Sequence, residues 1–285
     1  METLGCATVI CSDKTGTLTE NRMSVRKIYL SCEVLMVSGT GHRLEGEIFS
    51  PEGNPIKQTP KDLTRLFEIG VSCNNAGVIR EKGSIFDNLA RPKGLQTYGD
   101  PTEIAILIAA LKCGVNKEMV DRSFVRVKEV PFDSERKRMS VLVKDRRGEL
   151  FLFIKGATDV ILPFCTQIEQ EGQVRPITLK DENDIMMVND NMGGEALRVL
   201  SFAYKKVSMA EIGGKNIEQG LTFLGMMGMI DPPRPEAIGA VQKCLSSGIR
   251  PVMITGDHKA TAWAVARELS MITKDSRILT GREID

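Results

Sequence analysis

The hydrophobic positions along the chain change their spacing from one stretch to the next, and each spacing predicts an element. The apolar run from Ala7 to Cys11 predicts a buried strand near the start. Apolar residues between 60 and 73 recur at helical spacing and predict a helix. A second helix is expected after Asp100, a favourable N-cap residue before Pro101, and Glu103 would complete a capping box.

The middle of the chain has the pattern of an antiparallel sheet. Strands are expected at 125–130, 139–143, 150–154 and 198–203, and the turn Arg146–Gly148 would join the second strand to the third. Together with the two helices, these strands predict an α+β arrangement for this part of the chain.

After residue 220, strands and helices alternate. Strands are expected at 221–230 and 251–254, and helices at 235–245 and 259–269. This alternation is typical of a parallel sheet, and the strand near the start of the chain would join that sheet.

The overall fold class is therefore α/β with two domains. Residues 1–21 and 229–285 would form an incomplete, doubly wound parallel-sheet domain, and residues 22–228 would be inserted as an α+β domain built on an antiparallel sheet. A length of 285 residues suits two domains, each large enough to bury a core.

Composition excludes several classes of protein. The net charge of +1 gives no reason to expect binding to nucleic acid. Seven cysteines without a CxxC pair favour reduced thiols over a disulfide framework or a zinc site. No run of about 18 apolar residues is present, so no membrane-spanning helix is expected. The first residues also lack the features of a signal peptide.

The most informative segment is Asp13-Lys-Thr-Gly-Thr-Leu-Thr19, which follows the first strand. The carboxyl ends of parallel strands are where doubly wound sheets bind ligands, and a carboxylate there can attack a phosphoryl group. Lys14 and Thr17 would bind phosphate oxygens, or they are simply a solvated lysine and a turn threonine. An aspartate nucleophile also needs Mg²⁺ to offset the charge of a triphosphate, and Asp13 would share its oxygens between metal and phosphoryl group.

Two more strand ends carry candidate residues. Thr255 and Gly256 would meet phosphate oxygens next to a helix N-terminus, and Asp257 would orient a metal-bound water or a lysine, or serve only as an N-cap. In Asp231-Pro-Pro-Arg234, the prolines restrict the backbone and Arg234 would approach nucleotide phosphates, unless the segment is only a rigid surface turn.

The inserted part holds candidates for binding ATP. Arg136 and Arg138 lie in a basic turn just after Phe132, where they would meet the phosphates of a nucleotide. They would equally suit a solvated hairpin. Gly156 follows Lys155 at the end of an apolar strand and would allow close approach of a ligand.

The order of these motifs resembles the type II P-type cation-transporting ATPases, and the resemblance covers essentially the whole chain. Its details look most like bacterial calcium pumps. The motifs that carry it are Asp13-Lys-Thr-Gly-Thr17, Gly99-Asp-Pro-Thr-Glu103, Lys155-Gly-Ala157, Asp231-Pro-Pro-Arg234 and Thr255-Gly-Asp257.

The resemblance assigns roles to individual residues. Asp13 would become phosphorylated, the carbonyl of Thr15 would be a second Mg²⁺ ligand, and Asp231 would belong to an interdomain hinge. In the ATP site, Phe132 would stack on adenine and Lys155 would line the adenine pocket. Arg198 would meet the β-phosphate, while Glu103 would lie near the adenine amino group or act only as a capping residue.

The resemblance further implies the catalytic part of an ATP-driven pump on the cytoplasmic face of a membrane. Its transmembrane and actuator domains, and the bound cation, would lie outside this chain. The family's Thr-Gly-Asp-Gly-Val-Asn-Asp motif, with a third Mg²⁺ ligand, is absent, so little or no turnover is expected from this chain.

Two alternatives remain. One is a soluble phosphatase of the haloacid-dehalogenase type, but those enzymes usually carry a second aspartate where this chain has Thr15. Without that proton-transferring carboxylate, hydrolysis of an acyl phosphate should be slow. The other alternative is a nucleotide-binding module that is never phosphorylated.

Overall fold

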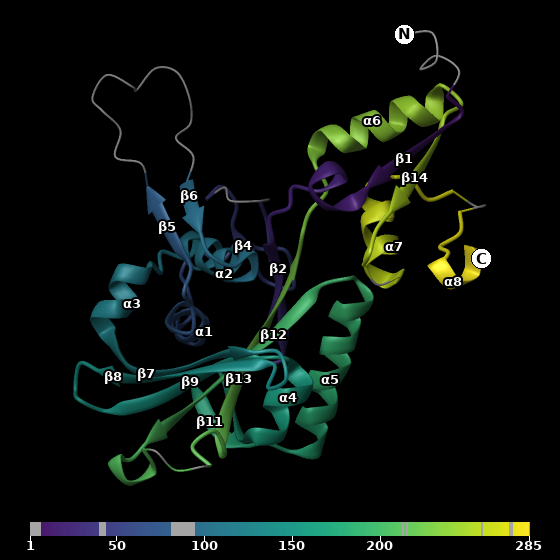
Figure 1. The fold of residues 1–285 in the computed structure, drawn as a ribbon. Coiled ribbons are helices and arrows are strands. Elements are labelled where there is room, and N and C mark those ends of the chain that lie inside the picture. Colours follow the sequence, from purple (N-terminus) through teal and green to yellow (C-terminus); the bar gives the residue numbers. More distant parts are fainter. Residues whose placement is uncertain are drawn as a thin grey trace, which may run out of the picture.

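The computed structural model describes residues 7–39, 44–80, 95–212, 214, 216–257, 259–273 and 276–284. Most strands in these residues belong to one large, mainly antiparallel sheet (Figure 1). Its order is β4-β3-β2-β13-β12-β9-β8-β7, and β10 lies parallel to β13 with β11 beside it. These strands are β2 (Ser24–Leu30), β3 (Glu33–Val37), β4 (Ile48–Phe49), β7 (Phe124–Asp133), β8 (Arg138–Asp145), β9 (Leu150–Gly156), β10 (Cys165–Gln170), β11 (Gln173–Pro176), β12 (Arg198–Val207) and β13 (Leu221–Ile230).

Helices cover both faces of this sheet. On one side lie α1 (Lys61–Ser72), α2 (Pro101–Lys112) and α3 (Lys117–Ser123), and on the other lie α4 (Thr158–Ile161) and α5 (Leu179–Gly194) (Figure 1). Because successive strand residues point to opposite faces, each strand contributes to two cores. In β8, Met139 and Val141 pack in the core beneath α1, whereas Leu142 packs in the core on the α4 side.

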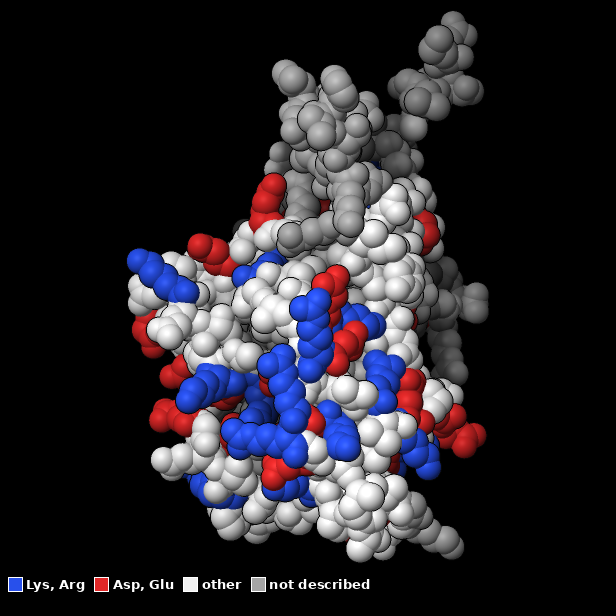
Figure 2. Space-filling model, turned by 90° about the vertical axis from the view of Figure 1, so that its left-hand side faces the viewer, with Lys and Arg blue, Asp and Glu red and all other residues white. Residues whose placement is uncertain are grey.

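Short elements complete this part. A separate antiparallel pair is formed by β5 (Gly77–Arg80) and β6 (Leu95–Tyr98). Single 3₁₀ turns occur at Leu162–Phe164 and Met209–Glu211. On the face to the left in Figure 1, where α3 and the β7 edge lie, Lys and Arg side chains gather with Asp and Glu between them (Figure 2).

The two ends of the described chain meet in a second, parallel pair of strands. β1 (Val9–Asp13) lies beside β14 (Arg250–Ile254), and Asp13 stands opposite Ile254. The helices α6 (Pro235–Ser246) and α7 (Lys259–Glu268) flank the pair on opposite sides (Figure 1). A last short helix, α8, spans Gly281–Ile284.

The expected elements and the antiparallel sheet are confirmed, but two expectations about burial and placement are wrong. β1 is not buried: Val9 is 47% and Ile10 is 41% exposed, because β14 is its sole partner strand within the described residues. β13 does not open the parallel part. It is antiparallel to both β2 and β12, and all ten of its residues are buried.

None of the helices in the described ranges has the length and hydropathy that a membrane span requires.

Candidate functional site

Asp13 lies at the carboxyl end of β1 with an exposed side chain. The chain then enters a wide turn of π-helical type, Lys14–Leu18, in which Gly16 has a φ of 75°. Such a φ is easily adopted only by glycine. Thr19 closes the turn, because its amide donates to the Lys14 carbonyl at 3.1 Å. The turn leaves Thr15 and Thr17 exposed beside Asp13.

Lys14 points inward and connects β1 to the end of β14. The residue is 5% exposed, and its ammonium group forms an ion pair with the Asp257 carboxylate. The Asp257 amide donates to the Thr255 hydroxyl at 3.1 Å, which folds the Thr255–Asp257 segment back on itself. The structure therefore brings together Lys14 and Asp257, two residues that are 243 positions apart in the sequence.

Asp231 and Arg234 hold the segment that follows Asp13. The Asp231 carboxylate accepts from the Thr19 hydroxyl at 2.6 Å and from the Arg22 amide at 3.0 Å. The Arg234 guanidinium donates to the carbonyls of Gly16 and Thr19, both at 2.9 Å. These contacts place both side chains at the crossing, where the chain passes between the large sheet and the β1–β14 pair at residues 19–23 and again at 231–234. They use two of the Arg234 nitrogen atoms on main-chain carbonyls.

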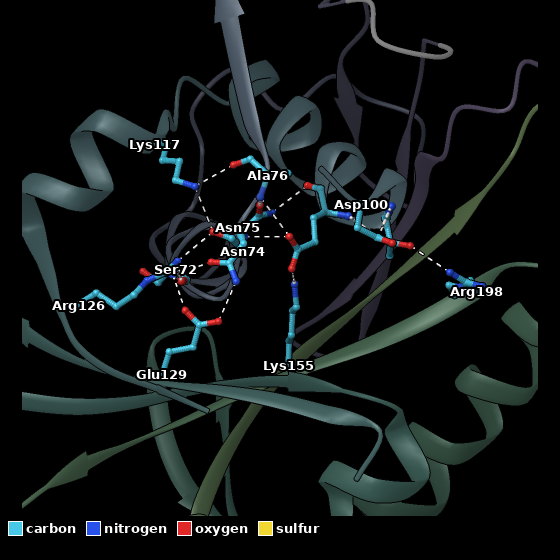
Figure 3. A network of polar contacts seen from close by, with 12 residues as sticks. Ser72, Asn74, Asn75, Ala76, Asp100, Lys117, Arg126, Glu129, Lys155 and Arg198 are labelled. Atoms are coloured by element: carbon cyan, nitrogen blue, oxygen red, sulfur yellow. Dashed lines mark hydrogen bonds and ion pairs between the residues drawn. The ribbon is translucent and has the colours of Figure 1, made fainter. Parts of the chain in front are cut away.

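A second cluster of polar side chains lies between the large sheet and the helices α1 and α2 (Figure 3). Lys155, at the end of β9 and 5% exposed, donates to Glu103 Oε1 at 2.5 Å. The other oxygen, Glu103 Oε2, accepts from the amides of Asn75 at 2.8 Å and Ala76 at 3.1 Å. The capping box expected for Glu103 is therefore wrong, because both carboxylate oxygens bind elsewhere.

Arg198 is a third sequence-predicted residue in this cluster, and it is bound through the start of α2. Asp100 is the N-cap as expected, and its carboxylate accepts from the Thr102 amide at 2.8 Å. The Thr102 hydroxyl in turn accepts from the Arg198 guanidinium at 3.0 Å. Lys155 and Arg198 thus contact the first turn of α2, through Glu103 and Thr102 respectively (Figure 3).

Gly99, in front of this helix, has a φ of +111°, and a Cβ atom there would lie 2.7 Å from the Ala76 Cα atom. A side chain at this position would therefore push α2 away from the Asn75–Ala76 turn.

Phe132 and the basic hairpin that contains Arg136 and Arg138 lie outside this cluster. Phe132 lies in β7 with 61% of its surface exposed, which leaves its ring free to stack on a ligand. Arg136 and Arg138 instead bind the carboxylate of Glu218, at 2.5 and 2.8 Å, and Arg138 also lies 4.7 Å from the centre of the Phe164 ring.

Arg138 and Lys155 point to opposite faces of the large sheet. Arg138 and Leu142 are an even number of residues apart in β8 and therefore point to the same face, the α4 side. Lys155 and Phe153 are related in the same way in β9 and point toward α1. The structure does not bring Arg136 and Arg138 together with Lys155.

Gly156 is explained by packing against the neighbouring strand. A Cβ atom on this residue would lie 2.6 Å from the Lys137 carbonyl oxygen and 2.7 Å from the Arg138 Cβ atom. The close approach that this glycine permits is therefore that of β8, and no ligand is needed to account for it.

A cavity of about 530 Å³ opens beside the crossing, and none of the predicted nucleotide-binding residues lines it. Its walls are formed by Asn21, Arg22, Leu95, Gln96, Thr97, Pro101 and Ile104.

Comparison with known proteins identifies the family. A family model described as "P-type ATPase, cytoplasmic domain N" matches residues 62–236. The chain belongs to the P-type ATPase family. The matched range contains Glu103, Phe132, Lys155 and Arg198, and it also contains the whole of α2.

Relatives of this P-type ATPase chain match it along its full length. It is 35% identical over 287 residues to a "Calcium-transporting ATPase" of Bacillus subtilis and 39% identical over 286 residues to "Calcium-transporting ATPase 1" of Bacillus cereus. It is 37% identical over 292 residues to the human "Calcium-transporting ATPase type 2C member 1". Each alignment covers 100% of this chain but only 31%, 29% and 29% of the respective relatives. The resemblance seen in the motifs is thereby confirmed.

Sequence reasoning missed several residues that bind the predicted ones. The Asn75 and Ala76 amides that bind Glu103 belong to the main chain, so no side-chain pattern could reveal them. Arg126 and Glu129 lie in β7 as an ordinary-looking pair of charges on a strand. Glu218, which binds the basic hairpin, lies about 80 residues farther along the chain, with no pattern that links it to that hairpin.

Proposed function

We propose that this chain is the ATP-binding and phosphorylated part of a calcium-transporting P-type ATPase, and that Asp13 accepts the γ-phosphate of ATP. One observation carries the proposal: an exposed carboxylate at the carboxyl end of a parallel strand, with Lys14 and Asp257 paired beside it. In this arrangement the lysine offsets a negative charge that would otherwise repel the incoming phosphate.

The reaction is a phosphoryl transfer. An oxygen of the Asp13 carboxylate forms a bond to the γ-phosphorus, the bond between that phosphorus and the β–γ bridging oxygen breaks, and ADP leaves with the electron pair. The Thr17 hydroxyl and the Thr255–Gly256 segment are the donors we assign to the phosphate oxygens. Because position 15 is threonine, no second carboxylate in this turn activates water, and the acyl phosphate persists.

Mg²⁺ fits the donors in this place. The ion prefers a few protein oxygens together with water and substrate phosphates, and Asp13 offers an exposed carboxylate next to the main chain of Thr15. When bound, the ion would neutralise charge that develops on the phosphate during transfer. We assign Asp13 and the Thr15 carbonyl as its protein ligands.

The adenosine end of ATP is assigned to the large sheet. Phe132 is exposed and available to stack on adenine, an interaction worth roughly 1–3 kcal/mol. Glu103, Lys155 and Arg198 provide one acidic and two basic groups within a single cluster. Arg136 and Arg138 are not assigned to the nucleotide, because both bind the Glu218 carboxylate on the other face of the sheet.

The remaining features of the whole protein follow from the same proposal. Residues 1–21 and 229–285 belong to a haloacid-dehalogenase-like phosphorylation domain, and residues 22–228 form the inserted nucleotide-binding domain. The protein acts at the cytoplasmic face of a membrane, with transmembrane and actuator domains and the transported calcium ion bound elsewhere in the pump.

The test is phosphorylation of the chain itself with γ-³²P-labelled ATP and Mg²⁺, followed by acid quenching. The expected result is an acid-stable label that hydroxylamine removes and that Asp13→Asn abolishes. Ser12→Ala changes the adjacent residue and serves as the control that keeps the label.

Each alternative has its own outcome in this assay. Rapid release of phosphate from small phosphoesters, without a persistent label, would favour a soluble phosphatase. ATP binding with no label in the wild-type chain would favour a module that only binds nucleotides. Either outcome overturns the proposal.

A further inference from the structure

We propose that Arg126 is a positioning residue for the nucleotide site: it orients the Asn74–Asn75 peptide group, which in turn holds the Glu103 carboxylate. This inference rests on the proposed function, because it concerns the ATP site described above. Arg126 lies in β7, one strand beyond β8 and two beyond the Lys155 strand, and nothing in its own sequence context marks it as functional.

Arg126 lies at the C-terminal end of α1. A helix leaves its last carbonyl groups without partners, and the helix dipole makes that end attractive to cations. The Arg126 guanidinium occupies it. Its Nη2 atom donates to the Ser72 carbonyl at 2.6 Å and to the Asn74 carbonyl at 2.9 Å. Its Nη1 atom donates to Asn75 Oδ1 at 2.7 Å and to Glu129 at 2.8 Å.

The peptide group between Asn74 and Asn75 links Arg126 to Glu103. The carbonyl of Asn74 and the amide of Asn75 belong to the same planar unit and point in opposite directions. Arg126 binds the carbonyl end, and Glu103 accepts from the amide end at 2.8 Å. A rotation of this unit would break both contacts together, so a group that fixes the carbonyl also fixes the amide.

A second cation strengthens the arrangement. Lys117, in α3, donates to the carbonyls of Asn74 at 3.1 Å and Ala76 at 2.8 Å. Two cations on the carbonyl side therefore face one carboxylate on the amide side (Figure 3). Hydrogen bonds in such a chain polarise one another, and a peptide bonded to a cation at its oxygen becomes a stronger donor at its nitrogen.

The orientation of the Glu103 carboxylate depends on these amides. Its Oε2 atom is held by the two amides, and its Oε1 atom is left for Lys155 at 2.5 Å. Loss of the amide contacts would allow the carboxylate to turn toward Lys155 with both oxygens. In the described part of the chain the guanidinium of Arg126 bonds to Ser72, Asn74, Asn75 and Glu129 and not to Glu103 or Lys155, so its contribution to nucleotide binding would be indirect.

The experiment compares Arg126→Gln with the wild type by ATP titration calorimetry and by ¹H–¹⁵N NMR. We expect ATP to bind about tenfold more weakly to Arg126→Gln. The Asn75 and Ala76 amide resonances should move upfield as their bonds to the carboxylate weaken. The matched control is Arg175→Gln, which removes a different arginine, paired with Asp181 on the α5 side, and should change neither readout.

Two comparisons separate positioning from a general loss of structure. In a Glu103→Gln background, Arg126→Gln should weaken ATP binding by less than about twofold, because the group it positions is already altered. Inosine triphosphate lacks the 6-amino group assigned to Glu103, so its affinity should hardly change in Arg126→Gln. If Arg126→Gln does not fold, Arg126→Lys keeps the charge but loses the fork, and it should shift the same two amides.

The possible failures are distinguishable. A wild-type chain that does not bind ATP would refute the proposed function, while the amide shifts would still test the orientation of the peptide group. A wild-type chain that binds ATP, with Arg126→Gln and Glu103→Gln additive in their effects or with unchanged amide shifts, would refute the positioning role alone.

Discussion

Replacing Lys155 with methionine tests how strongly the Lys155–Glu103 pair holds together the polar cluster between the large sheet and α1 and α2. Methionine fills a volume similar to that of the lysine stem but has no charge, so the variant removes mainly the ion pair. The side chains of Lys155 and Glu103 are only 6% and 15% exposed, so water cannot fully replace the lost partner.

The expected cost follows from what remains around Glu103. Removing one partner of a buried ion pair typically destabilises a protein by about 3–5 kcal/mol. Here the Glu103 carboxylate keeps two backbone amide donors, Asn75 and Ala76, which compensate part of its charge. We therefore expect Lys155→Met to lower the free energy of unfolding by about 2–3 kcal/mol.

A double-mutant cycle isolates the pair. Each single variant, Lys155→Met or Glu103→Gln, leaves one buried charge unpaired, whereas the double variant leaves none. The double variant should therefore lose about 2 kcal/mol less than the sum of the single losses.

Urea unfolding followed by far-ultraviolet circular dichroism measures all four proteins, with stabilities obtained by linear extrapolation. Additive losses, or a loss below about 0.5 kcal/mol for Lys155→Met, would show that the pair is effectively solvated and would refute the reasoning.

Three further predictions concern other parts of the chain. Gly156→Ala should lower the free energy of unfolding by about 1–3 kcal/mol in urea melts, because the new methyl group would overlap the Lys137 carbonyl. Asp100→Ala removes the N-cap of α2 and should cost about 1 kcal/mol in the same assay, whereas Asp100→Asn should cost much less. Burial raises the pKa of the Cys73 and Cys165 thiols from 9.0 to about 12, so the folded protein keeps both protons after the unfolded chain has lost them. Stability should therefore fall as pH rises above 9, and both thiols should resist iodoacetamide at pH 8 until the protein unfolds.

The elements that were predicted correctly have a strong local signal. α2 has an N-cap, a proline at its first position and an apolar run, and each of these acts within a few residues. The sequence Arg146–Gly148 predicted the turn between β8 and β9, and Gly148 in this turn has a φ of +84°. Such features are decided by neighbours in the chain, so the sequence is sufficient to predict them.

The features that could not be predicted depend on distant partners. A continuous apolar strand such as β13 is typical of a parallel sheet, but here it lies at the centre of an antiparallel sheet covered on both faces. The helix α5 could not be predicted because its sequence lacks a clear apolar stripe: Ile185 and Met192 are its only buried residues.

Which side of the sheet a charged residue occupies is equally invisible to local patterns. β7 and β8 change register between Val130 and Asp133, so the position of the basic hairpin depends on an irregularity in pairing. The local sequence around Arg136 and Arg138 suits phosphate binding, but Glu218 decides their position.

The two halves of the proposed site meet at a crossing that is itself hydrogen-bonded. Thr19 and Pro233 form a bridge between the outgoing and returning chains, and Asp231 accepts from Thr19 and from the Arg22 amide. Arg234 reaches back to the Gly16 carbonyl in the turn that follows Asp13. The crossing and the turn that follows Asp13 are therefore one bonded unit. Under the proposed function, a change in the angle between the two sheets would act on this unit before it reached Asp13, and the wide turn would couple that change to phosphoryl transfer.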